Sequence, residues 1–156
     1  MSWTALVEVQ DVTLGLAVGD DHWSVGSPEL LHAFFSTVSH RLESGGWGTR
    51  FPMLVGRLYD GELPVDAVET ALSELALVRR ELAWFAPAEV VWDIDDLAAQ
   101  PPWGGAIADS VPDLSRYFFT VDSRDLFDVL AAALAALQQQ GPGAALRIVA
   151  ATPVLV

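Results

Sequence analysis

The residue types that could do chemistry fall into two groups, and the first lies in one stretch of helical periodicity. His32, Ser36 and His40 are spaced four apart, and a serine between two histidines could be a nucleophile with its base. These residues belong, however, to the polar stripe of an amphipathic helix, and no acid is obviously placed to orient either histidine. His32 and His40 diverge by roughly 80° around a helix, so they do not form the pair that zinc helices use. We therefore expect no catalytic residue in this stretch.

The second group is a run of carboxylates. Asp93, Asp95 and Asp96 lie within four residues of one another, and oxygen ligands of this kind can hold a divalent cation. The run lacks the glycine and the distal glutamate of a calcium loop, and a strand end followed by a helix cap accounts for the same pattern. We expect no bound metal and no other cofactor.

The same aspartates belong to the most acidic stretch of the chain. Residues 89–113 contain six acids and no base, and tryptophans, prolines and glycines lie among them. The whole chain has a formal charge of −13 and no lysine. Like charges on one compact surface repel, but a basic partner would be attracted to them. We expect a docking surface for such a partner, with these candidate contact residues: Trp92, Asp93, Asp95, Asp96, Trp103 and Asp109.

Length and composition restrict the class of protein. A chain of 156 residues is expected to form one domain, residues 1–156. The absence of cysteine excludes disulfides and thiolate metal sites. No apolar run approaches the length of about 20 residues that a membrane span needs, and the first residues do not resemble a signal peptide. We expect a soluble, cytoplasmic protein that binds neither nucleic acid nor anionic membranes, because eight arginines face 21 acids.

The elements that must position these residues follow from periodicity and from capping residues. Strands are expected twice within residues 3–18, forming an N-terminal hairpin, and then at 51–59, 90–92, 115–121 and 146–150. Helices are expected from Ser27 to about Glu43, from Pro64 to about Phe85, and after a cap at Asp122 or Ser123. This order predicts an α/β fold, with α+β also possible: a single layer of mixed β-sheet with about three helices packed on it.

The roles of the tryptophans and of Arg50 are predicted from the residues around them in the sequence. Trp84 and Trp92 lie in periodic elements and are expected in the core, as is Trp3. The other three, Trp23, Trp47 and Trp103, lie in glycine- or proline-rich loops, where an indole is a candidate contact residue. Arg50 is expected to hold the protein's own carboxylates.

Several motifs follow one another in a recognisable order: Arg50-Phe51-Pro52, Asp60-Gly61-Glu62, Leu72-Ser73-Glu74-Leu75 with Glu81-Leu82, Leu114-Ser115-Arg116-Tyr117-Phe118-Phe119, and Asp122-Ser123-Arg124-Asp125-Leu126. Their order and spacing resemble the immunity protein 70 family, which is found beside toxin genes in bacterial polymorphic toxin systems. The resemblance covers roughly residues 28–150. It implies an α/β fold and neutralisation of a cognate toxin by binding, with no catalytic residue. This chain has Asp122-Ser123 where the family often has Asp-Gly.

Three functions from different classes follow. The first is an immunity protein that binds a cognate toxin, which the charge predicts to be basic and possibly a nuclease. The second is a small metal-assisted hydrolase that uses the aspartates from Asp93 to Asp96 or the helix with His32 and His40. The third is a non-catalytic assembly subunit in which the loop tryptophans mediate self-association. The oligomeric state stays open.

Overall fold

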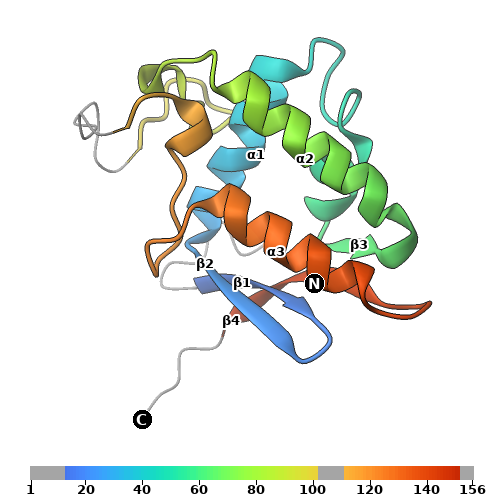
Figure 1. The fold of residues 1–156 in the computed structure, drawn as a ribbon. Helices are drawn as coiled ribbons and strands as arrows, with labels where there is room; N and C mark the ends of the chain where they lie inside the picture. Colours follow the sequence, from blue (N-terminus) through green and yellow to red (C-terminus); the bar gives the residue numbers. More distant parts are fainter. Residues whose placement is uncertain (1–12, 102–110, 152–156) are drawn as a thin grey trace.

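The computed structural model describes residues 13–101 and 111–151 of the chain. Figure 1 shows all three α-helices on the same side of one sheet. Every pairing among the described strands is antiparallel, where a mixed sheet was expected. The expected fold class, with helices packed on a single layer of sheet, is confirmed. In spatial order the strands are β2 (Asp21–Gly26), β1 (Thr13–Val18), β4 (Ala145–Ala151) and β3 (Glu62–Pro64).

The N-terminal hairpin is confirmed, with β1 and β2 as its two strands. Gly19 takes a φ of 57° at the turn, a conformation that glycine adopts without steric cost. No strand was expected at residues 21–26, where the structure has β2. The earlier of the two strands expected within residues 3–18 falls on residues 1–12, which lie outside the described residues.

The first two long helices follow their sequence signals. Ser27 caps α1 (Pro28–Leu42), and its hydroxyl oxygen accepts a hydrogen bond from the Leu30 N–H at 3.2 Å. The second helix, α2 (Val68–Leu82), follows a single 3₁₀ turn and buries the apolar stripe that its periodicity predicted. Helical spacing of apolar residues is therefore sufficient to locate both helices.

The third helix, α3 (Leu126–Gln138), begins later than expected. Its cap is Asp125, whose Oδ1 accepts a hydrogen bond from the Phe127 N–H at 2.8 Å. The two residues expected as caps have other roles. Asp122 accepts a hydrogen bond from the Thr120 hydroxyl, and Ser123 has a φ of 65° within the preceding turn. The prediction of the helix was correct and the prediction of its cap was wrong.

Residues 51–59 were expected to form a strand, and this prediction was wrong. They contain the π-helix η2 (Pro52–Leu58). Its first backbone amides bond to a residue of α2, since the Leu54 N–H donates to Glu74 Oε1 at 2.8 Å. The buried positions, Leu54, Val55 and Leu58, have helical spacing. A short apolar run fits either element, and here the contact with α2 decides in favour of a helix.

The expected strands at 90–92 and 115–121 are also absent from the described part of the chain. The second contains the 3₁₀ turn η5 (Leu114–Arg116) and a single bridge between Phe119 and Asp125. The Val91 N–H and C=O pair with the side chain of Thr37 on α1 rather than with a strand. In the first segment these backbone groups bond to a helix, and in the second the Val121 N–H donates to the Val25 C=O of β2 without forming a strand there.

The core is centred on Phe34 of α1. Its ring makes edge-on contacts with Phe35, Phe118 and Phe127, at centroid distances of 5.4, 5.4 and 5.3 Å. This geometry is the one that aromatic pairs prefer. The cluster ties α1 to α3 and to the segment between η5 and α3, so the first helix has a fixed position from which to present its polar residues.

Candidate functional site

The acidic segment that begins at Glu89 is attached along the length of α1. The Thr37 hydroxyl donates to the Val91 C=O at 3.1 Å and accepts from the Val91 N–H at 3.0 Å. The Ile94 N–H donates to Ser36 Oγ at 3.1 Å, and Arg41 Nε donates to the Glu89 C=O at 2.8 Å. The polar residues of α1 therefore hold the acidic segment in place.

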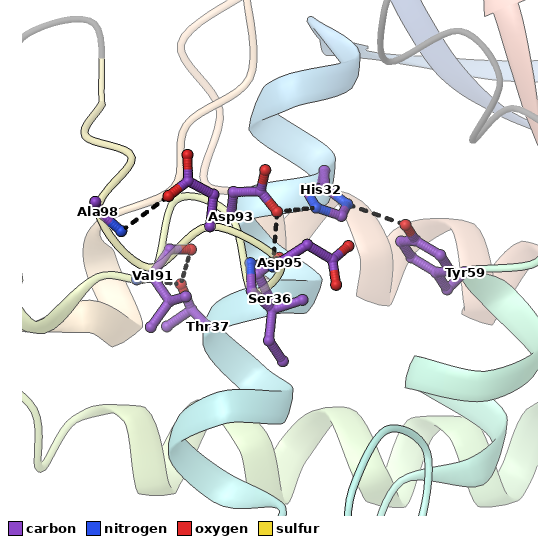
Figure 2. Close-up of polar contacts among 10 residues, drawn as sticks. His32, Ser36, Thr37, Tyr59, Val91, Asp93, Asp95 and Ala98 are labelled. Carbon is purple, nitrogen blue, oxygen red and sulfur yellow. Dashed lines mark hydrogen bonds and ion pairs between the residues drawn. The ribbon is translucent and has the colours of Figure 1, made fainter.

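His32 lies between two partners on different segments, as Figure 2 shows. Its Nδ1 is 3.0 Å from the Tyr59 hydroxyl, and its Nε2 is 3.1 Å from Asp93 Oδ1. An ionised carboxylate only accepts hydrogen bonds, so in the neutral ring Nε2–H donates to Asp93 and Nδ1 accepts from Tyr59. The expectation that no acid orients this histidine was wrong, because Asp93 does so from 61 residues away in the sequence.

The position of the polar stripe of α1 was also misjudged. His32 and Ser36 are buried, and only His40 of the three spaced residues is exposed. The acidic segment covers this side of the helix. Helical spacing placed these residues on one side, but no sequence signal shows that a segment about 60 residues later packs over it.

The aspartates of this segment differ in their roles. Asp93 is half-buried, and its Oδ1 also accepts from the Asp95 N–H at 2.9 Å. Asp96 Oδ1 accepts from the Ala98 N–H at 3.2 Å. The side chains of Asp95 and Asp96 are exposed. The segment is therefore a series of tight turns, each stabilised by a carboxylate, with two of its charges exposed to water.

The pKa of Tyr59 reports the electrostatic character of this site. Burial of the phenol, followed by the nearby charges of Asp95, Asp93 and Asp60, raises its pKa from 10.0 to about 12. The negative charge of an ionised phenol is unfavourable beside three carboxylates. Asp93 and Asp95 therefore lie close enough to the Tyr59 phenol to produce a negative potential there.

Ligand atoms of His32, Asp93 and Asp95 lie within 4.8 Å of one another, which is close enough for a metal ion. Their chemistry fits zinc or a similar cation. Both ring nitrogens of His32 already have hydrogen-bond partners, and Asp93 Oδ1 has two. The cluster is satisfied by protein groups, and the absence of a metal stays a prediction.

Four of the six candidate contact residues lie among the described residues, and they are neighbours in the sequence. Trp92 is half-buried against the core, and Asp93, Asp95 and Asp96 follow it directly. Trp103 and Asp109 lie outside the described residues, so their placement stays a prediction. Among the other tryptophans, the expectation for Trp84 was wrong: it is 73% exposed at the end of α2.

Comparison with known proteins gives one match. The family model described as Immunity protein 70 matches residues 16–146, from β1 to β4. The chain belongs to the immunity protein 70 family. No curated protein and no solved structure matches it. Membership implies an immunity protein that binds a cognate toxin, and it suggests a role without catalysis.

The motifs that resembled the immunity protein 70 family form part of the scaffold. Arg50 forms an ion pair with Glu81 of α2, and its Nη1 donates to Glu81 Oε1 at 2.8 Å and to the Leu42 C=O at 3.0 Å. The hydrogen bonds from Arg50 hold the pKa of Glu81 below its usual value. The expectation that Arg50 holds the protein's own carboxylates is confirmed.

Two further buried acids fix the loop between α1 and η2. Glu43 accepts hydrogen bonds from the N–H groups of Gly48, Arg50 and Phe51, at 2.9, 3.0 and 2.9 Å. Glu74 accepts from the first amides of η2, and its burial raises its pKa. These carboxylates have structural roles, and contact between the acids of residues 93–96 and a toxin stays a prediction. Within the described residues, none of the helices of this immunity protein 70 member is long and apolar enough to cross a membrane.

Proposed function

We propose that this chain neutralises a basic toxin domain, of nuclease type, in the bacterial cytoplasm by covering its substrate-binding surface. Family membership supplies the general role of toxin binding. The basic character of the toxin, its nuclease activity and the contact surface are our inferences. A nuclease must present cations to hold phosphates, and an acidic protein can occupy the same surface.

The observation that supports this proposal most directly is the acidic segment fixed on α1. Four hydrogen bonds, to Ser36, Thr37 and Arg41, hold its backbone. The exposed carboxylates of Asp95 and Asp96 therefore have limited freedom to lose when a partner binds. A preorganised negative surface accelerates encounter with a cationic protein, and speed matters for an inhibitor that must act before its toxin does.

Charge reversal tests the contact surface. The double variant Asp95→Lys/Asp96→Lys should associate with the cognate toxin domain about tenfold more slowly at low salt. The slope of the association rate against salt concentration should also become shallower, because the exposed charges of the contact surface change sign. Stopped-flow fluorescence at several salt concentrations measures both quantities.

A matched control separates local charge from net charge. Asp20→Lys/Asp21→Lys makes the same change in total charge at the exposed turn of the β1–β2 hairpin. The other end of β2, Gly26, lines the same pocket as Trp92, and the turn lies a strand's length from Gly26, about 17 Å at 3.3 Å per residue. If the control slows association as much as the first variant does, the acidic segment is not the contact surface.

A second candidate function rests on one observation, the convergence of His32, Asp93 and Asp95. A metal-assisted hydrolase would need a cation there. Titration calorimetry with magnesium, calcium and zinc distinguishes the two functions. Stoichiometric heat that His32→Asn abolishes would favour the enzyme, whereas rescue of toxin-expressing cells by this chain, with no metal heat, supports the inhibitor.

A further inference from the structure

A groove lies beside the acidic segment, on the side nearer the start of α1. Its volume is about 440 Å³, which falls in the range of ordinary ligand pockets. The β2–α1 junction, Trp92 and the segment that precedes α3 form its walls, and Figure 1 shows that last segment, in orange, beside the junction. The residues that matter for its chemistry are Gly26, Glu29, Leu30, Trp92, Phe119 and Val121.

The groove is lined by apolar side chains that folding leaves in water. Phe119 is 45% exposed and Val121 is 63% exposed, whereas Thr120 between them is only 5% exposed. Five large apolar side chains are exposed in the described part of the chain, and two of them meet in this one groove. Gathered exposed apolar surface marks an interaction site more reliably than single exposed residues do.

The walls of the groove are held rigidly. The Val121 N–H donates to the Val25 C=O of β2 at 2.8 Å, and the Thr120 N–H donates to the Arg124 C=O at 2.8 Å. Gly26 has a φ of 151°, and a Cβ added there would lie 3.2 Å from atoms of both Leu30 and Val121. Glycine therefore keeps the floor of the groove open. A rigid apolar surface binds with little loss of conformational entropy.

The charges beside the groove are mostly negative. Glu29 lines it, and Asp93 directly follows Trp92 in the chain. Glu29 lies one helical turn before His32, the partner of Asp93, so the groove and the acidic segment meet on the same side of α1. Asp122 is exposed beside Val121, and the nearby Arg124 is paired with it at 3.6 Å. A partner that fills this groove must bring an apolar side chain flanked by positive charges.

We propose that the groove takes an apolar side chain of the toxin as the anchor of the complex. This inference depends on the proposed function, and it adds a division of roles. The aspartates set the rate of encounter, and the groove sets the lifetime of the complex. Buried apolar anchors at the centre of an interface supply most of the binding energy, while charges around them chiefly affect association.

Polar substitution of the two exposed wall residues tests the groove. Phe119→Ser/Val121→Ser should raise the dissociation rate of the complex with the cognate toxin domain by about tenfold or more, and it should change the association rate by less than about twofold. Surface plasmon resonance gives both rates. Val121→Thr, nearly the same shape, is the second variant in case the first is unfolded by circular dichroism, and it should raise the dissociation rate in the same direction.

Trp84→Ser is the matched control, since it also removes an exposed apolar side chain. Trp84 follows Glu81, which Arg50 joins to the Leu42 C=O at the other end of α1, and α1 rises about 18 Å from Leu30 to Leu42. An unchanged dissociation rate in the groove variants, or an equal change in the control, overturns the proposal that the groove binds the toxin. If the wild-type chain does not bind the toxin domain at all, the proposed function fails instead. Dimerisation of the wild-type chain that the groove variants abolish would make a second copy the occupant and would also overturn the inference.

Discussion

The attachment of the acidic segment to α1 can be tested with one nearly isosteric substitution, Thr37→Val. The Thr37 hydroxyl is the hydrogen-bond partner of both the N–H and the C=O of Val91, and both bonds are buried. Valine keeps the shape of the side chain and removes both bonds. Because Val91 directly precedes Trp92 and Asp93, the change acts on the backbone that positions the candidate contact residues.

The expected magnitude follows from the burial of both groups. Each buried backbone group left without a partner costs about 1–3 kcal/mol. The additional buried methyl group of valine returns about 1 kcal/mol. We therefore expect the free energy of unfolding to fall by about 3 kcal/mol, which is a large share of the stability of a protein of this size.

Urea unfolding, followed by tryptophan fluorescence, measures this change. Thr37→Ser is the control, because it keeps both hydrogen bonds and loses only a methyl group, at a cost of about 1 kcal/mol. Hydrogen exchange should show faster exchange of the Val91 and Ile94 amides in the valine variant, since their segment opens locally. A loss of less than about 1 kcal/mol in Thr37→Val, or a larger loss in Thr37→Ser, would refute the proposed attachment.

Two further predictions concern pH. Glu81→Gln should lower the free energy of unfolding by about 1 kcal/mol at pH 7, a modest value because solvent reaches Arg50. The Arg50 hydrogen bonds lower the pKa of Glu81 in the folded state, so this stability is present above the unfolded pKa of 4.5 and is lost as the pH falls through the folded value. The free energies of unfolding of the wild-type protein and of Glu81→Gln, measured with urea, should therefore converge below pH 4.5. A difference that stays constant with pH would contradict the ion pair. Tyr59→Phe should remove a phenol absorbance change that the wild-type protein shows near pH 12 in an alkaline titration. The pKa of Tyr59 is raised by burial to about 12, so the stability that it contributes is present below pH 10 and is lost as the pH rises towards 12. Completion of the wild-type titration by pH 11 would show that Tyr59 is not buried beside the aspartates.

Local sequence patterns were sufficient for part of the fold. The apolar spacing of α2 and the Ser27-Pro28 start of α1 located both helices, because capping and periodicity act within a few residues. The same method failed at residues 51–59. An apolar run of that length fits a strand or a helix equally, and its conformation is decided by Glu74, a residue on another helix.

The candidate site shows the same limit. The acidic segment was visible in the sequence because charge and composition need no fold to be counted. The partnership of His32 with Asp93 joins residues 61 apart, and that of Thr37 with Val91 joins residues 54 apart. No periodicity extends over such separations, so the sequence placed His32 on the polar stripe of an amphipathic helix and missed the segment that covers it.

The sequence by itself determined the charge of this protein, the presence of its α-helices and the position of its acidic stretch, since each depends on residue types and short-range spacing. The tertiary structure alone decided which carboxylates support the fold and which face water. It also decided that Phe119 and Val121 share a groove with Trp92. These outcomes depend on how distant segments pack together, and packing is set by the shape of the whole core.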